Sequence, residues 1–517
     1  MRRGRRFFRN ALALSITAMI MRCVSVSFNV YLSDKLGADG IGLYTLVMSV
    51  YGFGVTLATS GIHLAATRMV AEALGDSSAG AGAVRAAMRQ CLGYSVCFGT
   101  GAAALLLIFA PYISAHWLQD ARTLPALRLL ALSLPPIALS SALGGYFSGV
   151  RRVHKTAAVQ LAEQGLRVTV TIFALQVFLP RGLMYACIGV VLGGMLAEFF
   201  SCFLLFLAFL RDRKRAFPAA AAPPVSSLRR KLFGIALPVA VSAYARSLLV
   251  TVEHLLIPIC LRKSGATRDA SLAAYGTLHS MVLPILLFPS ALLGSISGLL
   301  IPEMAEYRAK GEEAEIRRVA SKVIRLALIF SIGTAGVMSC HAYSLGTVIY
   351  ASTDAADYIR LLAPLVPVMY LDNTIDAMLK GLGEQVYSMN VNILDAALSV
   401  GLVLLLLPRE GIGGYLVVLY ICETFNAVCS IHRLLGITAL NVDVIGWIGQ
   451  PLLAIVGATV LTRLFGMRYP AVDAWSLACR IAVTVGGYLL LLGVMRLLGR
   501  GRPVVVRGRR AVLEHGL

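Results

Sequence analysis

The chain has 517 residues, of which 58% are hydrophobic and only 14% are charged, and its mean hydropathy is +0.78. This balance excludes an ordinary soluble domain and predicts an all-α membrane protein that crosses the bilayer many times. The net charge of +21 would indicate nucleic-acid binding in a soluble chain, but in a membrane protein basic residues first report topology. We therefore expect no nucleic-acid partner.

The sequence contains no constellation typical of an enzyme, a metal site or a cofactor site. The ten cysteines lie mostly in apolar runs without C-x-x-C spacing, which argues against disulfides and structural zinc. Residues 149–156 resemble a phosphate loop but lack the glycine before the lysine. We expect neither catalysis nor a bound cofactor, so a gradient, the membrane potential or a partner must supply the energy for any work.

Apolar runs of bilayer length fill most of the chain. The first follows a basic stretch at residues 2–9 that resembles a secretory signal, but Arg22 interrupts the run and no small-residue cleavage site follows. We therefore interpret it as a transmembrane helix. The runs predict fourteen spans, at residues 10–31, 41–62, 90–111, 124–146, 157–178, 184–208, 233–258, 272–298, 322–340, 358–379, 387–407, 412–432, 446–464 and 475–496.

Basic residues are distributed unequally between the predicted connections. With the N-terminus in the cytoplasm, the cytoplasmic segments hold 31 of the 47 lysines and arginines. The external segments hold nine, namely Lys35, Arg122, Arg181, Arg262, Lys263, Arg268, Arg409, Arg463 and Arg468. This asymmetry predicts a multi-pass protein of the cell membrane with both termini in the cytoplasm.

A basic connection rich in proline and alanine, at residues 211–231, divides the chain. It separates a first lobe of six spans, residues 1–210, from a second lobe of six spans, residues 232–435. Because six is even, both lobes cross the membrane in the same direction, which predicts a parallel repeat. Residues 436–517 are predicted to form an extra helix pair, spans thirteen and fourteen, and a basic cytoplasmic tail.

Polar residues recur at equivalent places in the two lobes, within apolar helices where chance agreement is least expected. Arg22 matches Arg246, and at the same separation along the chain Asn29 matches Glu253. At slightly different separations, the matching pairs are Gly149 with Gly381, Gln160 with Asn392, Glu163 with Asp395, and Glu198 with Glu423. We treat Gln160, Asn392, Asp395, Glu198 and Glu423 as polar candidates for lining a cavity.

The first helix of each lobe carries an arginine in the middle of an apolar run, Arg22 and Arg246. An arginine there costs roughly 2.5–3.5 kcal/mol on insertion, so it is normally kept where it faces a cavity or a partner. Asn29 and Glu253 follow seven residues later, and two helical turns place each pair on one face. Two such faces opposite each other predict a central cavity. The alternative is that each arginine pairs with a neighbouring carboxylate and locks helices together.

Acidic residues of the second lobe form another set of candidates. Asp372, Asp376 and Lys380 follow one another at intervals of four on the tenth span, and Glu253 lies in the same lobe. We expect Glu253, Asp372 and Asp376 to bind a coupling proton or sodium ion. An ion pair between Asp376 and Lys380 is an equal alternative.

The first lobe differs because one of its acids has a basic residue at helical spacing. Glu163 and Arg167 are four residues apart, so we expect them to neutralise each other in a structural role. Glu198 and Glu423, near the middle of spans six and twelve, have no evident partner in the sequence.

Three short motifs near the N-terminus carry a family resemblance. LGADGIGLY at residues 36–44, TSGI at 59–62 and RMVAE at 68–72 resemble the opening of the stage V sporulation protein B family of polysaccharide-biosynthesis proteins. That family belongs to the multidrug/oligosaccharidyl-lipid/polysaccharide (MOP) exporter superfamily, which also contains lipid II flippases. The resemblance implies two six-helix lobes around a cavity that opens alternately to each side, and a final helix pair that accommodates a long lipid tail. By position, it also implies that Arg22 and Arg246 meet a pyrophosphate.

The resemblance and the paired arginines predict a flippase for an undecaprenyl-pyrophosphate-linked saccharide, either lipid II or a polysaccharide unit, in cell-wall, spore-cortex or polysaccharide synthesis. Guanidinium groups suit a diphosphate because they make charge-assisted, often bidentate contacts. The alternative is a cation-coupled multidrug antiporter whose cavity is made negative by Glu253, Asp372 and Asp376, and a third class is a nontransporting scaffold for envelope or spore-coat assembly. The partners that we expect are the lipid-linked saccharide, membrane lipids and envelope-synthesis enzymes, with the protein itself a monomer.

Overall fold

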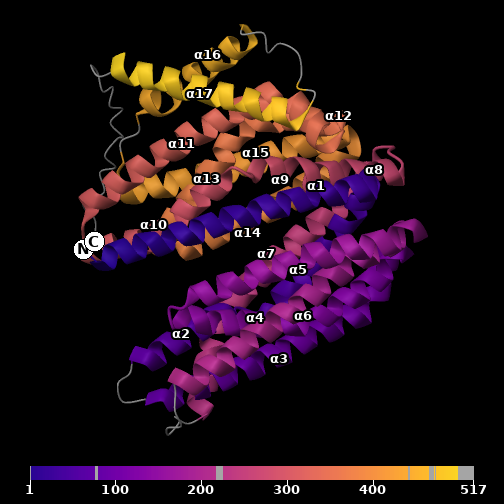
Figure 1. Ribbon diagram of the computed structural model, residues 1–517, viewed down its shortest axis with the longest axis vertical. Coiled ribbons are helices and arrows are strands. Elements are labelled where there is room, and N and C mark those ends of the chain that lie inside the picture. Colours follow the sequence, from indigo (N-terminus) through magenta and orange to yellow (C-terminus); the bar gives the residue numbers. More distant parts are fainter. Residues whose placement is uncertain are drawn as a thin grey trace, which may run out of the picture. The chain divides into compact units, whose positions relative to one another are not determined.

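The computed structural model describes residues 2–75, 80–216, 225–440, 443–464, 471 and 473–498, and every regular element among them is helical (Figure 1). The α-helices are α1 (Arg2–Thr59), α2 (Ile62–Gly75), α3 (Gly80–Tyr112), α4 (Leu124–Gly149), α5 (Val153–Phe178), α6 (Leu183–Ala216), α7 (Val225–Lys263), α8 (Arg268–Gly276), α9 (Leu283–Leu287), α10 (Ser290–Lys310), α11 (Glu313–Ser344), α12 (Thr353–Leu362), α13 (Val366–Gly381), α14 (Gln385–Glu410), α15 (Ile412–Thr438), α16 (Gln450–Leu464) and α17 (Ala474–Leu498). Short π or 3-10 segments adjoin them: η1 (Ile113–Trp117), η2 (Ala121–Thr123), η3 (Leu179–Arg181), η4 (Thr277–Val282), η5 (Leu345–Ile349), η6 (Ala363–Leu365) and η7 (Ile445–Gly449). The middle of the predicted linker, residues 217–224, and the basic tail beyond residue 498 lie outside the described residues.

Eleven helical stretches in the described part of the chain are long and apolar enough to cross a membrane. They are Met19–Leu74, Gly82–Trp117, Ala121–Gly149, Leu183–Asp212, Leu228–Lys263, Arg268–Leu287, Glu313–Ile349, Gln385–Glu410, Ile412–Thr438, Ile445–Leu464 and Ala474–Met495. The first joins the predicted spans one and two. Predicted spans five and ten carry charged residues in mid-helix and are not among the eleven; span five corresponds to α5, and span ten to the end of α12 together with η6 and α13. The prediction of an all-α polytopic membrane protein is confirmed, with eleven candidate spans.

Large apolar side chains face outward from these helices. Ile108 on α3, Phe173 on α5 and Leu490 on α17 are each 65% exposed or more. An apolar exterior of this kind is what a lipid-facing surface requires, whereas in water it would be an association site. Phe173 gives α5 the same apolar exterior as the candidate spans.

A glycine separates the two helical segments of α1, which correspond to the first two predicted spans. α1 runs for 58 residues, but Gly37 within it has a φ of 73° and a ψ of 172°, which are not helical values. Glycine adopts a positive φ without the steric strain that a Cβ atom creates. The turn that the sequence predicts at residues 36–40 is therefore a kink between two helical segments.

The chain folds into two compact units, each built from more than one stretch of sequence. Unit 1 comprises Met1–Val30, Thr277–Ser399 and Ile412–Leu517, and unit 2 comprises Tyr31–Gly276 and Val400–Gly411. The first segment of α1 therefore belongs to unit 1, while α7 belongs to unit 2. The lobe boundaries at residues 210 and 232 stay a prediction.

Each unit has its own apolar core. In unit 2, α2, α3, α4 and α6 pack around Met69, Tyr146 and Phe147. In unit 1, α10, α11, α13, α16 and α17 pack around Met304 and Trp447, and Figure 1 shows α16 beside α17.

One tight helix contact occurs in both units, at positions that the predicted repeat relates. A Cβ atom on Gly149 of α4 would lie 2.9 Å from Val70 Cβ on α2, and one on Gly381 of α13 would lie 2.8 Å from Met304 Cβ on α10. Either distance is too short for a real Cβ contact. The glycines therefore let the two helices of each pair approach more closely than any larger residue permits.

Candidate functional site

A three-residue ion cluster joins α5 to α6 in unit 2. The Nη2 atom of Arg167 lies 2.9 Å from Glu163 Oε1 and 2.8 Å from Glu198 Oε1. The three side chains have exposed fractions of 32% or less. The first contact is the one that the four-residue spacing predicts. The second depends on the packing of α5 against α6, which gives Glu198 a partner that the sequence did not reveal.

The second acidic cluster lies in unit 1 and brings together three predicted candidates from three helices. Asp372 on α13 and Asp395 on α14 lie close enough to Glu423 on α15 for their charges to act on it directly. All three side chains are half-buried. Among the described residues, no group of three or more acids, histidines or cysteines converges into a metal-binding shell. The cluster is therefore a negative region within the helix bundle that suits a proton or a loosely held cation.

Arg22 and Asn29 lie on the first segment of α1, and both are half-buried. The Nε atom of Arg22 is buried and donates no hydrogen bond to any described residue. Its charge acts on the hydroxyl of Tyr370 on α13, in the same unit. Of the two predicted arginines, Arg22 therefore has the environment that better suits an anion.

The corresponding pair on α7 is more open. Arg246 is exposed, whereas Glu253, two turns further along, is half-buried. The charge of Glu253 acts on Tyr275 of α8, whose hydroxyl lies 2.7 Å from Nδ1 of His254. Because Arg22 and Arg246 belong to different units, their meeting in one cavity stays a prediction.

The remaining predicted residues make local contacts. Lys380 Nζ lies 2.5 Å from Asp376 Oδ2, and the hydroxyl of Ser388 donates to the other oxygen of the same carboxylate. The ion pair that was one of two interpretations for Asp376 is therefore present. The amide of Asn392 donates to the backbone carbonyl of Ser388 at 2.8 Å, and Gln160 is exposed on α5.

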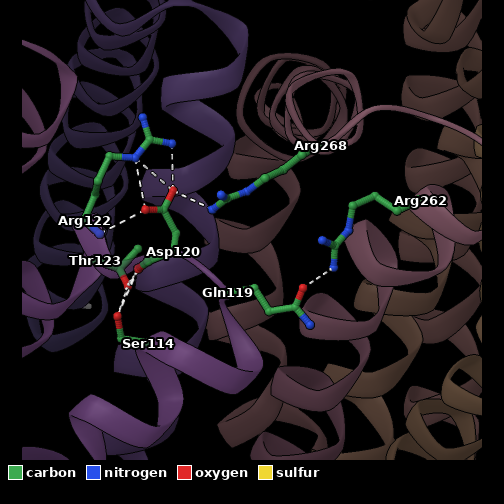
Figure 2. A network of polar contacts seen from close by, with 7 residues as sticks. All are labelled: Ser114, Gln119, Asp120, Arg122, Thr123, Arg262 and Arg268. Carbon is green, nitrogen blue, oxygen red and sulfur yellow. Dashed lines mark hydrogen bonds and ion pairs between the residues drawn. The ribbon is translucent and has the colours of Figure 1, made fainter.

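A polar network near the start of α4 was not predicted (Figure 2). Asp120, only 3% exposed, lies 2.7 Å from Arg122 on η2 and 2.7 Å from Arg268 at the start of α8. Burial by itself raises the pKa of Asp120, but the hydrogen bonds from Arg122 and the charge of Arg268 outweigh it and hold the pKa below its ordinary value. Beside this network, Arg262 donates to the amide oxygen of Gln119 at 2.6 Å. The signal that the sequence offered was one acidic residue, Asp120, close to a basic residue in a predicted external connection.

A similar network at the other end of unit 2 was also missed. Asp212 near the end of α6 is 4% exposed and pairs with Arg152 and, at 2.7 Å, with Lys155. The hydroxyl of Tyr146 donates to its second oxygen at 3.1 Å. The basic residues at 151–155, interpreted from sequence as topology signals, therefore also tie α4 and α5 to α6.

Comparison with known proteins identifies the family and the fold of this chain. Residues 7–308 match the family described as polysaccharide biosynthesis protein. Stage V sporulation protein B of Bacillus subtilis (strain 168) is 26% identical over 513 residues, which cover 97% of this chain and 98% of that protein. The structure of the lipid II flippase MurJ in an inward closed conformation aligns with a TM-score of 0.71 and 11% identity, over 95% of this chain and all of the other. An inward-facing multidrug resistance MATE family transporter of the MOP superfamily aligns with a TM-score of 0.64 and 12% identity, over 82% of this chain and 98% of the other. The chain therefore belongs to the polysaccharide biosynthesis protein family, and it shares its fold with the lipid II flippase and the MOP-superfamily transporter.

Proposed function

We propose that the protein flips an undecaprenyl-pyrophosphate-linked saccharide from the inner to the outer leaflet. The observation that carries the proposal is the half-buried guanidinium of Arg22 in a membrane helix, whose Nε donates no hydrogen bond to any described residue. A guanidinium in that state is costly unless an anion meets it. A diphosphate offers the bidentate contacts that a guanidinium prefers. The similarity in fold to a lipid II flippase supports the same class of substrate.

In this proposal the substrate crosses by alternating access between two six-span lobes. α1 crosses the membrane twice, once on each side of Gly37, and α5 and α13 complete a set of fourteen spans. The outward-facing Phe173 supports α5 as a span, and the unequal distribution of basic residues supports cytoplasmic termini. α16 and α17 stand outside the repeat and accommodate the lipid tail.

Reporter fusions after Arg215 and at the C-terminus test the orientation of the chain in the membrane. An external signal at either position contradicts the cytoplasmic location of that position.

The energy for transport comes, in the same proposal, from proton or sodium binding in unit 1. Asp372, Asp395 and Glu423 supply the negative charge, because the first two act on Glu423 and the three lie on different helices that a conformational change can displace. Glu253 on α7 is a further coupling candidate. Asp376 is not, because Lys380 already balances its charge.

Flipping by purified protein in proteoliposomes tests the substrate. The probe is a fluorescent polyprenyl-diphosphate saccharide, and the rate is divided by the amount of folded protein. We expect Arg22→Ala and Arg246→Ala to abolish flipping and the lysine variants to retain part of it, because lysine keeps the charge but loses the planar fork. Arg128→Ala, which removes an exposed arginine from α4, is the matched control and keeps the full rate. Normal flipping per folded molecule with reduced abundance would instead give both arginines a structural role.

A cation-coupled multidrug antiporter is the second candidate function, and the acidic cluster of unit 1 is the observation that favours it. A cationic drug needs net negative charge in its path, which Asp372, Asp395 and Glu423 supply. The two functions differ in the sign of the transported group. Uptake of a fluorescent organic cation into the same proteoliposomes, with no flipping of the diphosphate lipid, selects the antiporter.

The cellular setting is proposed from the relatives. The relative stage V sporulation protein B is named for sporulation, which supports a role in spore-cortex or cell-wall synthesis. In this proposal the protein acts as a monomer beside envelope-synthesis enzymes. Depletion of the protein in cells, followed by identification of the lipid-linked intermediate that accumulates on the inner leaflet, identifies the saccharide.

A further inference from the structure

Unit 2 contains an apolar cavity of about 330 Å³ between α1, α3 with η1, and α7. Its walls are formed by side chains such as Phe53 and Leu57 from α1, Leu106 from α3 and Leu248 from α7. Thr251 is the hydroxyl-bearing residue of the α7 wall, and that hydroxyl already donates to the carbonyl of Ser49 at 3.2 Å. The cavity therefore suits a hydrocarbon chain and offers little to a saccharide.

Aromatic residues line this cavity where α3 and η1 end. Tyr112 and Trp117 line it there and contact each other edge to face, with ring centroids 6.3 Å apart. Both are more than 40% exposed. Tyrosine and tryptophan gather at the level of lipid headgroups, because one side of each ring is apolar and the other polar. This end of the cavity therefore lies at a membrane surface.

Positive charge is concentrated beside the aromatic end. A smaller hollow shares Trp117 with the cavity and is lined by Arg262 and Arg268. The connection from η1 to α4 and the connection from α7 to α8, with the helix ends that flank them, form the basic loops of this region. They contain four of the nine basic residues assigned to the external side, Arg122, Arg262, Lys263 and Arg268, but only two acidic residues, Asp120 and Asp269.

Of these cations, Arg262 is the one best placed for a ligand. Arg122 and Arg268 both contact Asp120, whereas Arg262 is held by the neutral amide of Gln119, as Figure 2 shows. Its charge is therefore not cancelled by a carboxylate in the described part of the chain.

We propose that this part of unit 2 is a binding site for an anionic phospholipid, with one acyl chain in the cavity and the phosphate against Arg262. The acyl chain cannot supply the specificity, because a chain leaving the bilayer exchanges one apolar environment for another. The specificity comes from the basic loops, which attract an anionic headgroup. The site does not depend on the proposed flipping activity, since it uses neither Arg22 nor the acidic cluster.

Tryptophan fluorescence tests the site directly, because Trp117 lines both hollows. The chain has three tryptophans, so Trp447→Phe with Trp475→Phe leaves Trp117 as the only one. This protein is reconstituted in phosphatidylcholine with a small fraction of chain-brominated phosphatidylglycerol, or with the same fraction of brominated phosphatidylcholine. We expect the anionic lipid to quench Trp117 roughly fivefold more, which is the enrichment that one basic residue near an anionic headgroup provides.

Matched variants separate the headgroup from the chain. Arg262→Gln removes the preference for phosphatidylglycerol, whereas Arg181→Gln, an exposed arginine on η3, keeps it. Leu248→Phe fills the cavity and weakens quenching by both lipids, whereas Leu237→Phe, on the same helix but away from the residues that line the cavity, does not. Circular dichroism and gel filtration establish that each variant is folded.

Three results overturn the proposal. Equal quenching by the two lipids shows that the cavity is merely open to bulk lipid. Equal loss in Arg181→Gln and Arg262→Gln shows a general surface-charge effect. Displacement of brominated phosphatidylglycerol by unlabelled polyprenyl phosphate, but not by unlabelled phosphatidylglycerol, assigns the site to the carrier lipid instead.

Discussion

The ion cluster of unit 2 and the acidic cluster of unit 1 occupy equivalent places in the predicted repeat but differ in charge. In unit 2, Arg167 joins Glu163 and Glu198 into a compact ion cluster. In unit 1, the equivalent acids are Asp395 and Glu423, and the alignment that pairs Glu163 with Asp395 places Ser399 opposite Arg167.

Unit 1 gains a further acid where unit 2 has none. Asp372 on α13 acts on Glu423, whereas the same alignment of the two lobes places Ser140 opposite Asp372. Two carboxylates thus share one guanidinium in unit 2, while in unit 1 two carboxylates act on a third. Mutual repulsion between like charges favours uptake of a proton or a cation, so one site of the repeat is suited to holding helices together and the other to binding a coupling ion.

The largest expected effect is the loss of ion coupling in unit 1. Glu423→Gln removes the carboxylate on which the other two act, so we expect the stimulation of transport by a proton or sodium gradient to fall by at least about tenfold. The measurement is flipping in proteoliposomes with and without an imposed gradient. Glu198→Gln, at the equivalent place in unit 2, is the control and keeps the stimulation. Equal losses in both variants contradict the assignment of coupling to unit 1.

The next effect is on stability and belongs to unit 2. Arg167→Ala leaves Glu163 and Glu198 half-buried without their cation, so we expect a loss of about 1–3 kcal/mol in the free energy of unfolding. Thermal unfolding in detergent measures it, and ion-stimulated flipping per folded molecule stays normal. Addition of Glu198→Gln to the variant recovers part of the loss because it removes one uncompensated charge. A stable Arg167→Ala protein that has lost its ion dependence reverses the roles of the two clusters.

The two clusters show which contacts the sequence can predict and which it cannot. Recurrence of Glu163, Glu198, Asp395 and Glu423 was visible because acids are rare in apolar helices. The pairing of Arg167 with Glu163 followed from helical spacing. The contact between Arg167 and Glu198 did not, because it depends on the rotation of α6 against α5, which the spacing within one helix does not determine.

The fold shows the same limit. Composition and apolar runs predict the class of fold and most of its helices. α5 and α13 are too polar for a count by hydropathy alone, whereas the two helices that the sequence indicates on either side of residues 36–40 are present and meet at the kink at Gly37. The network around Asp120 was missed because its partner Arg268 lies in a distant part of the sequence, beyond the linker between the predicted lobes. Such contacts become visible only when helices far apart in the chain are packed together.

Asp120 reverses the stoichiometry of the ion cluster around Arg167, because here one carboxylate lies between two arginines. Its folded pKa lies below its ordinary value, so its contribution to stability is complete above about pH 4 and is lost as the pH falls through the folded pKa. We expect thermal stability of the wild type to be independent of this group between pH 5 and 8. Asp120→Asn lowers the free energy of unfolding by about 1–2 kcal/mol throughout that range. If the difference in the free energy of unfolding between the wild type and Asp120→Asn grows between pH 5 and 8, the stabilisation does not come from the Asp120 carboxylate.

The smallest expected effect distinguishes two carboxylates on one helix. Asp372 and Asp376 lie one turn apart on α13, but Asp376 pairs with Lys380 while Asp372 acts on Glu423. A partly exposed pair at four-residue spacing contributes about 0.3–0.5 kcal/mol, so Asp376→Asn should change stability by no more than that and leave ion stimulation intact.

The double variant Asp376→Asn with Lys380→Gln isolates the pair in a mutant cycle, because the coupling energy is the part of the stability change that the single variants do not add up to. Asp372→Asn on the same helix is the matched comparison, and it should lose ion stimulation as Glu423→Gln does. If Asp376→Asn loses the stimulation and Asp372→Asn keeps it, the coupling site includes the end of α13 near Lys380. In that case the acids of unit 1 differ in function from their relatives in unit 2 for a reason other than the missing arginine.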